Sequence, residues 1–123
     1  MRIATWNVER LSPQKRLPGI LEELRRVDAD ILVLTETDRR IQPNYPYDYH
    51  TPLLSKAVSG EYYRPTENRV SIFTKYPAIR QHSVADAHTS LCVELKTERG
   101  SLVVYGTIFG IYGNRRPSFQ LGI

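Results

Sequence analysis

The first 36 residues of the chain carry the pattern that most constrains its fold, because they read as a strand, a helix and a second strand. Residues 2–6 are mostly apolar or β-branched, as in a short strand. Residues 31–34 form an unbroken apolar run, typical of a buried parallel strand when a helix precedes it. Between them, apolar side chains recur at helical spacing: Leu17, Ile20, Leu21, Leu24 and Val27. The sequence therefore predicts a right-handed β-α-β unit over residues 2–36.

The remainder of the chain predicts antiparallel strands. Residues 55–68 are polar and contain glycine and proline, so we expect a loop there. Strands are expected at residues 47–53, 69–75, 79–84, 91–97 and 101–108. The last two form a hairpin around Glu98-Arg99-Gly100. The fold class is therefore α+β, with a mixed, mostly antiparallel sheet and an N-terminal β-α-β unit.

Composition narrows the functional classes. The chain of 123 residues has one cysteine, Cys92, which excludes an intrachain disulfide and a cysteine-based zinc cluster. No stretch approaches the ~20 apolar residues of a membrane span, and the N-terminus is too polar for a signal peptide, so we expect a soluble, cytoplasmic protein without membrane contact. The net charge of +4 favours an anionic partner such as nucleic acid or another phosphate ester, although an ordinary solvated surface carries a similar excess.

Two polar residues follow the predicted parallel strands. Asn7 ends the first strand and Glu36 ends the second. The carboxyl ends of parallel strands emerge at one edge of a sheet, and neighbouring strands lie ~4.8 Å apart. An amide oxygen and a carboxylate there suit Mg²⁺, which prefers oxygen ligands and keeps several waters. Asn and Glu are also common at strand ends without any metal, so both interpretations stay open at this point.

The segments around these residues resemble the endonuclease/exonuclease/phosphatase superfamily, which includes exonuclease III-like and DNase I-like enzymes. The resemblance covers nearly the whole chain in order. Its two N-terminal motifs are matched by IATWNVERL at residues 3–11 and DADILVLTETD at residues 28–38. NRVSIFTKYP at residues 68–77 and GSLVVYGTIFG at residues 100–110 are similar to the next two family segments.

The resemblance implies the first half of a four-layer αββα sandwich and metal-dependent hydrolysis of phosphodiester or phosphomonoester bonds. It implies that Glu36 is a ligand of Mg²⁺ or Mn²⁺ and that Asn7 helps to hold the same ion. Asn68 and Arg69 are further candidates, as contacts to a substrate phosphate. Within the superfamily, substrates include DNA, RNA, phosphoinositides and small phosphate esters, and the basic balance of this chain favours nucleic acid.

The chain departs from the family pattern in two places. Many members carry Thr-His where this chain has Thr107-Ile108. The later Gly-Asp-x-Asn motif, which orients the attacking water, and the Ser-Asp-His motif, which carries the catalytic histidine, do not occur. Residues 114–120 also look like the start of a helix. We therefore expect residues 1–123 to form a single, truncated domain, which could be a non-catalytic fragment or binding module. A half-domain exposes one sheet face, through which it could self-associate.

Other candidate residues have ordinary interpretations. The three histidines, His50, His82 and His88, lack metal-ligand spacing and are expected to be surface or hydrogen-bonded residues. The segment Tyr62-Tyr63-Arg64 combines aromatic rings with a cation and could stack on a base, but a packed loop anchor is the simpler interpretation. Arg115 and Arg116 are either phosphate contacts or a solvated pair.

Overall fold

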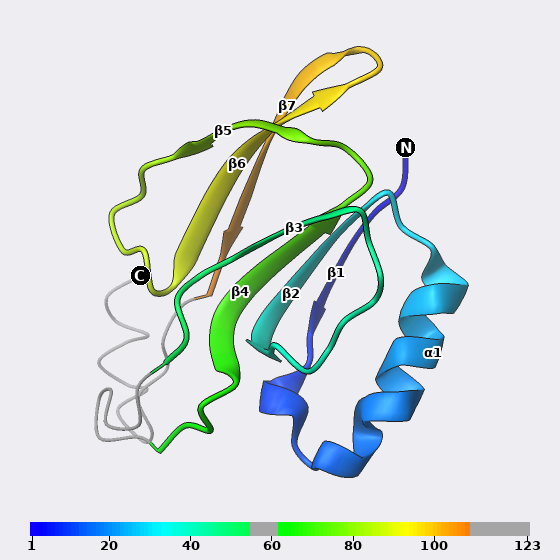
Figure 1. Ribbon diagram of the computed structural model, residues 1–123, viewed down its shortest axis with the longest axis vertical. Coiled ribbons are helices and arrows are strands. Elements are labelled where there is room, and N and C mark those ends of the chain that lie inside the picture. The colour runs from blue at the N-terminus through cyan, green and yellow to red at the C-terminus, as the bar shows by residue number, and fades with distance from the viewer. Residues whose placement is uncertain (55–61, 109–123) are drawn as a thin grey trace, which may run out of the picture.

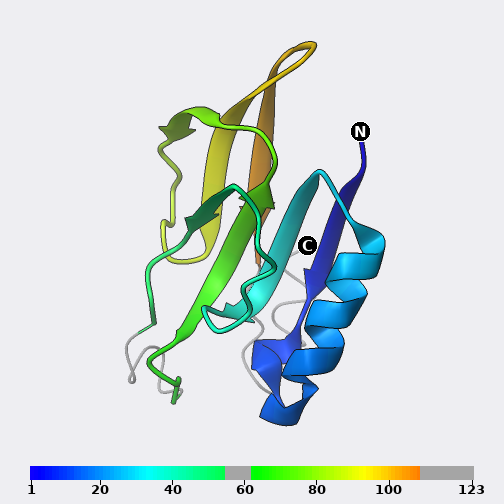
Figure 2. The same ribbon diagram turned by 45° about the vertical axis from the view of Figure 1, so that its right-hand side comes forward.

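The computed structural model describes residues 1–54 and 62–108, which form three layers (Figures 1 and 2). Helix α1 (Leu17–Val27) covers one face of a four-stranded sheet, called sheet A, and a three-stranded sheet, called sheet B, lies against the other face. In spatial order, sheet A contains β1 (Ile3–Asn7), β2 (Ile31–Asp38), β4 (Glu67–Thr74) and β3 (Tyr47–His50). Sheet B contains β5 (Ala78–His82), β6 (Ser90–Thr97) and β7 (Gly100–Thr107).

The predicted β-α-β unit is confirmed. Strands β1 and β2 are parallel, in register from Ile3 opposite Ile31 to Asn7 opposite Thr35. Helix α1 covers the apolar positions that predicted a helix, and two short 3-10 turns precede it, η1 (Glu9–Leu11) and η2 (Gln14–Arg16). The α+β class and the mostly antiparallel pairing are also confirmed, and α1 with the two sheets matches the first layers of the expected sandwich.

The strands differ from the sequence prediction mainly at their ends. Strand β4 begins at Glu67, two residues before the predicted start, because Glu67 and Asn68 are buried and paired with β2. Strand β3 ends at His50. The next residue, Thr51, accepts a hydrogen bond at its Oγ1 from the backbone N–H of Val70 at 3.0 Å. The predicted hairpin is present, with Thr97 paired to Gly100 and Gly100 at a φ of +124°.

Two apolar cores hold the layers together. The first lies between α1 and sheet A and consists of Val8, Leu11, Ile20, Leu24, Ala29, Leu32, Leu34, Ile41 and Phe73. The second lies between the two sheets and consists of Ile31, Val33, Val70, Ile72, Leu91, Val93 and Leu95. At Gly106 of sheet B, an added Cβ atom would lie 2.8 Å from Val70 Cγ1 and 3.1 Å from Val33 Cγ1 of sheet A. The sheets can pack this closely only because residue 106 has no side chain.

No helix in the described residues is long and apolar enough to cross a membrane. The predicted helix start at residues 114–120, the pair Arg115 and Arg116, and residues 55–61 of the predicted loop lie outside the described residues.

Candidate active site

The structure brings the two predicted site residues to one edge of sheet A. Asn7 is the last residue of β1 and pairs with Thr35 of β2, the residue immediately before Glu36. The next residue, Val8, donates its N–H to the Thr35 carbonyl oxygen at 3.1 Å, which extends the pairing to the end of both strands. The side chain of Asn7 is exposed and that of Glu36 is half-buried. This edge is the lower one in Figure 1, where the arrowheads of β1 and β2 point.

Glu36 has a backbone conformation that is rare inside a strand. Its φ is 47°, in the left-handed region, although β2 continues to Asp38. Regular alternation would place Glu36 on the same face as Leu32 and Leu34, against α1. The pairing of β2 with β4 keeps its register on both sides of Glu36, with Thr35 opposite Val70 and Thr37 opposite Asn68. Such strain in a non-glycine residue costs about 1–3 kcal/mol and is concentrated at functional sites.

The oxygen atoms of both residues remain available for a ligand. In the described part of the chain, no hydrogen bond or ion pair occupies the Glu36 carboxylate. Asn7 Oδ1 accepts one hydrogen bond, from the backbone N–H of Glu9 at 2.9 Å. That bond fixes the orientation of the amide and leaves the second lone pair of the oxygen free.

The turn after Asn7 is strained as well. Glu9, Arg10 and Leu11 all have left-handed φ angles, of 55°, 60° and 53°. For L-residues this costs roughly 1–2 kcal/mol each, so tertiary contacts must hold the turn. Leu11 is fully buried in the first core, and Arg10 binds the buried Glu67. The edge that carries Asn7 is therefore fixed by contacts on both sides of the turn.

Two buried carboxylates lie behind this edge, and the sequence analysis did not identify them. Asp38 accepts two hydrogen bonds from the Arg40 guanidinium, both at 2.9 Å, one from Thr66 Oγ1 at 2.9 Å and one from Arg64 Nε at 3.4 Å. Burial alone would raise the pKa of Asp38, but the hydrogen bonds from Arg40 and Thr66 outweigh it and hold this pKa below its ordinary value. Asp38 is therefore a charged, fully paired anchor rather than a free acid.

The second buried carboxylate belongs to Glu67. Its two oxygens accept hydrogen bonds from Arg10 Nε at 2.7 Å and Arg10 Nη2 at 3.1 Å, and the backbone N–H of Arg64 adds a third at 2.7 Å. Together with Asp38, it ties the residues after β1, β2 and the start of β4 into one network. The run Asp38-Arg39-Arg40 directly after a buried strand is the sequence signal that could have indicated this network.

The structure gives Asn68 and Arg69 different environments. Asn68 is buried, and its Nδ2 donates to the Val70 carbonyl at 2.8 Å and to Ser71 Oγ at 2.9 Å, whereas its Oδ1 has no hydrogen-bond partner in the described residues. Arg69 is half-buried and donates from Nη2 to the Tyr63 hydroxyl at 2.6 Å. Their role in substrate binding stays a prediction.

The available ligands suit a sparse site for a hard cation. The described residues contain no group of three or more His, Cys, Asp or Glu side chains that could hold a metal. One carboxylate and one amide oxygen at an open sheet edge fit Mg²⁺ or Mn²⁺, which complete their coordination with water and substrate oxygens. The histidines do not contribute: His50 bonds to Ser71, His82 bonds to Glu94 and His88 is exposed.

Comparison with solved structures identifies the class of fold. The endonuclease domain of TRAS1, a telomere-specific non-LTR retrotransposon, matches with a TM-score of 0.64 and 12% identity over 97% of this chain and 50% of that one. Humanized TDP2 from D. rerio matches with a TM-score of 0.68 and 13% identity over 99% and 53%. TDP2 from Caenorhabditis elegans matches with a TM-score of 0.63 and 16% identity over 95% and 38%. The chain thus spans about half the length, or less, of these structures, which share its layered α+β fold.

The sequence identifies the family within that fold. The model of the endonuclease/exonuclease/phosphatase family matches residues 4–118, and the chain belongs to this family. Its members are typically hydrolytic nucleases and phosphatases, and they generally use divalent metals. No curated protein sequence matches the chain.

Proposed function

We infer that this chain is part of a divalent-metal-dependent phosphoesterase that hydrolyses phosphodiester bonds in nucleic acid. The observation that carries the inference is Glu36, a strained residue at the carboxyl end of a parallel strand, whose carboxylate has no partner in the described residues. It stands in the family's second motif, next to a strand that ends on Asn7. Family membership makes metal-dependent hydrolysis the chemistry that this arrangement best supports.

The residues of this chain would bind the ion and fix its position. Glu36 would supply a carboxylate oxygen and Asn7 an amide oxygen to Mg²⁺ or Mn²⁺. When bound, such an ion polarises the phosphoryl group and stabilises the leaving oxygen. The left-handed backbone of Glu36 and the hydrogen bond from Glu9 to Asn7 orient these oxygens before the ion arrives, so little reorganisation is needed on binding.

Hydrolysis also needs an activated water, and general acid–base assistance contributes typically 10²–10⁴-fold. The sequence contains neither the Gly-Asp-x-Asn nor the Ser-Asp-His motif that supplies this assistance in the family. We therefore expect the 123-residue chain to bind the ion weakly and to hydrolyse phosphodiesters very slowly. A longer protein that contains those motifs in frame would be active.

Metal titration tests the site without relying on activity. We expect Mn²⁺ binding, followed by electron paramagnetic resonance, to be lost in Glu36→Gln and retained in Glu23→Gln, a matched change on the exposed surface of α1. Both variants should unfold at temperatures close to that of the parent chain. Equal Mn²⁺ binding by the two variants would refute the assignment of Glu36.

Activity tests the reaction. A generic oligonucleotide and a phosphomonoester are compared, with and without chelator, for the 123-residue chain and for a longer protein that includes the missing motifs. Chelator-sensitive cleavage of the oligonucleotide by the longer protein, abolished by Glu36→Gln, is the expected result. A longer protein that cleaves neither substrate would favour the alternative function, a non-catalytic binding module, which the absence of the water-activating motifs from this sequence supports.

A further inference from the structure

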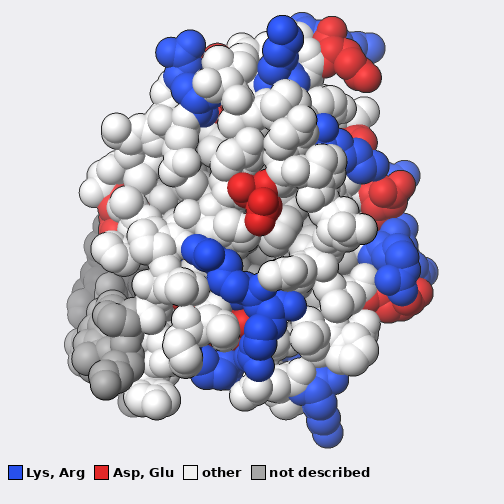
Figure 3. Space-filling model, in the orientation of Figure 1, with Lys and Arg blue, Asp and Glu red and all other residues white. Residues whose placement is uncertain are grey.

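Five arginines surround the edge of sheet A that carries the candidate active site. Figure 3 shows a band of basic side chains below the centre of this face, with one acidic patch just above it. The arginines come from η1, from the turn after β2, and from the start of β4 with the segment before it: Arg10, Arg39, Arg40, Arg64 and Arg69. Three of them, Arg10, Arg40 and Arg64, pair with Asp38 or Glu67, and both of these carboxylates are buried.

The five arginines fall into two groups, according to whether they pair with a buried carboxylate. Arg10, Arg40 and Arg64 neutralise the two buried carboxylates and hold the edge together. Arg39 and Arg69 have no carboxylate partner in the described residues. Their positive charges are therefore not compensated locally, as a surface that attracts an anion requires.

Arg39 and Arg69 are nevertheless held in place by neutral groups. Arg39 Nη2 donates to the Thr51 carbonyl oxygen at 2.9 Å, while its Nε is buried without a partner in the described residues. The guanidinium of Arg69 lies 5.2 Å from the centre of the Tyr63 ring, and that of Arg10 lies 4.7 Å from the same centre. Tyr63 is only 3% exposed, so it is a packed anchor that positions two cations without neutralising them.

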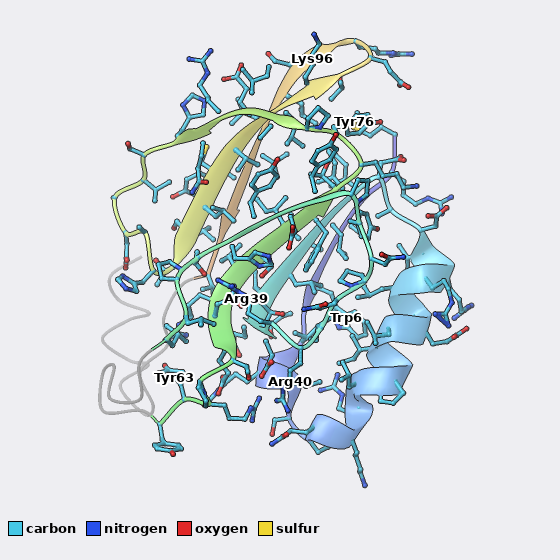
Figure 4. The ribbon with its side chains drawn as sticks, viewed as in Figure 1. Trp6, Arg39, Arg40, Tyr63, Tyr76 and Lys96 are labelled. Atoms are coloured by element: carbon cyan, nitrogen blue, oxygen red, sulfur yellow. The ribbon has the colours of Figure 1, made fainter. Side chains whose placement is uncertain are left out.

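The neighbouring tyrosine, Tyr62, differs from Tyr63 in that its side chain is exposed to solvent. Tyr62 is 76% exposed, the most exposed large hydrophobic side chain in the described residues. Its backbone is fixed beside the arginines, because the Tyr62 carbonyl oxygen accepts a hydrogen bond from Arg10 Nη2 at 2.7 Å. Figure 4 places Arg39, Arg40 and Tyr63 around the end of β2 and the start of β4. An exposed ring is thus anchored at the margin of a basic surface.

We propose that this arginine–tyrosine surface, made of Arg39, Arg69 and Tyr62, binds single-stranded nucleic acid. Arg39 and Arg69 contact phosphates, and the Tyr62 ring stacks on an unpaired base, a combination that suits single strands because stacked duplex bases present no free face. The inference rests on the proposed function, because the surface borders the Asn7–Glu36 edge and would guide a strand to it. It adds the strandedness of the substrate, which Asn7 and Glu36 do not specify.

Fluorescence anisotropy with a labelled oligothymidylate tests the phosphate contacts. The measurements use the full 123-residue chain in EDTA, so that metal binding and hydrolysis play no part. Each phosphate contact to a single strand contributes a slope of roughly −0.7 to log K against log salt, so Arg39→Gln/Arg69→Gln should make the slope shallower by roughly 1.4. The control Arg25→Gln/Arg26→Gln removes the same charge from exposed positions on α1 and should leave the slope unchanged.

Tyr62→Ala tests the stacking contact. Loss of one base–aromatic stack weakens single-strand binding by roughly 5- to 150-fold. The salt slope should stay the same, since no phosphate contact is removed, and duplex affinity should not change. Tyr105→Ala, which truncates another exposed tyrosine on β7, serves as the control. Circular dichroism spectra show whether each variant is folded. The double variant Arg39→Lys/Arg69→Lys keeps both positive charges, so it should retain the salt slope of the parent chain.

The outcomes separate this inference from the proposed function. If Arg39→Gln/Arg69→Gln and Arg25→Gln/Arg26→Gln reduced the salt slope equally, the single-strand surface would be refuted, even if a longer protein proved to be a nuclease. Equal affinity of the parent chain for single strands, duplex and poly-glutamate would refute it as well. Selective single-strand binding in EDTA together with no hydrolysis by any longer protein would refute the proposed reaction and leave the surface standing.

Discussion

His50 Nδ1 lies 2.7 Å from the hydroxyl oxygen of Ser71, and His50 Nε2 lies 2.7 Å from Asp48 Oδ2. Ser71 Oγ also accepts a hydrogen bond from Asn68 Nδ2 at 2.9 Å. Four side chains therefore form one chain of hydrogen bonds across β3 and β4. The Ser71 hydroxyl is buried, so it stabilises the sheet and is not exposed as a nucleophile.

This chain of hydrogen bonds predicts a pH-dependent stability. Burial lowers the pKa of His50 below its ordinary 6.5, and the positive charge of Arg39 adds to the effect, while the hydrogen bond to Asp48 opposes it. The fold therefore favours the neutral ring. Its contribution is complete above about pH 6.5, the value expected for an unfolded histidine, and is lost as the pH falls through the lower folded value. Urea unfolding at pH 8 and pH 5 should show a larger loss on acidification for the parent than for His50→Gln.

His88→Gln is the matched control for that measurement, because His88 is exposed. It should keep the pH dependence of the parent chain. If His50→Gln and the parent lost the same free energy of unfolding between pH 8 and pH 5, the neutral, buried state of His50 would be refuted.

Asp38→Asn should be strongly destabilising. The substitution leaves Arg40 and Arg64 facing an uncharged amide behind the candidate site. Breaking a buried ion pair by removing one partner costs about 3–5 kcal/mol of unfolding free energy, and thermal unfolding would measure this loss.

The ion pairs of Asp38 also depend on pH. Because the pKa of Asp38 is lowered, its contribution to stability is complete above the ordinary value of 3.8 and is lost as the pH falls through the folded value below it. The exposed Glu98→Gln should change the stability by less than about 0.5 kcal/mol. Similar effects of the two substitutions would contradict a structural role for Asp38.

Two glycine-to-alanine substitutions should have opposite effects. At Gly106 the new methyl group would lie 2.8 Å from Val70 Cγ1, and this overpacking between the sheets should cost about 1–3 kcal/mol. At Gly19, in the first turn of α1, the new Cβ would meet no side chain and no backbone outside the helix within 4 Å, and alanine should stabilise the helix by about 0.5–1 kcal/mol. Chemical denaturation gives the free energy of unfolding of both variants, which is compared with that of the parent chain. Val70→Ala should partly rescue Gly106→Ala, and failure to do so would show that the close contact does not limit stability.

Self-association remains a prediction, and the exposed apolar side chains of β1 and β7 motivate it. Ile3 is 56% exposed and Val103 is 55% exposed, and each belongs to the last strand in the order of its sheet among the described residues. We expect sedimentation velocity to show a concentration-dependent increase in mass that Ile3→Thr/Val103→Thr reduces. Leu53→Thr, at an exposed apolar residue outside the strands of both sheets, is the control. A chain that stays monomeric at high concentration would rule this association out.

Local patterns made much of the fold predictable. The spacing of Leu17 to Val27 fixed the helix, and the apolar run before Glu36 identified the second parallel strand, because both depend on side chains close in sequence. The division into two sheets, which the family resemblance implied, was not predictable from local patterns, because it depends on long-range packing at positions such as Gly106. The same holds for the left-handed φ of Glu36 and for the burial of Glu67, which a partner more than fifty residues away, Arg10, makes possible.

The left-handed conformation of Glu36 has a consequence for evolution and for engineering. Glycine or asparagine would adopt a φ of 47° with less strain than glutamate, so local stability and the proposed metal site favour different residues at this position. A library selected only for heat resistance should therefore drift toward Gly or Asn at position 36, and one selected for turnover should keep Glu. The residue found at position 36 would therefore indicate whether a lineage was selected for stability or for catalytic activity.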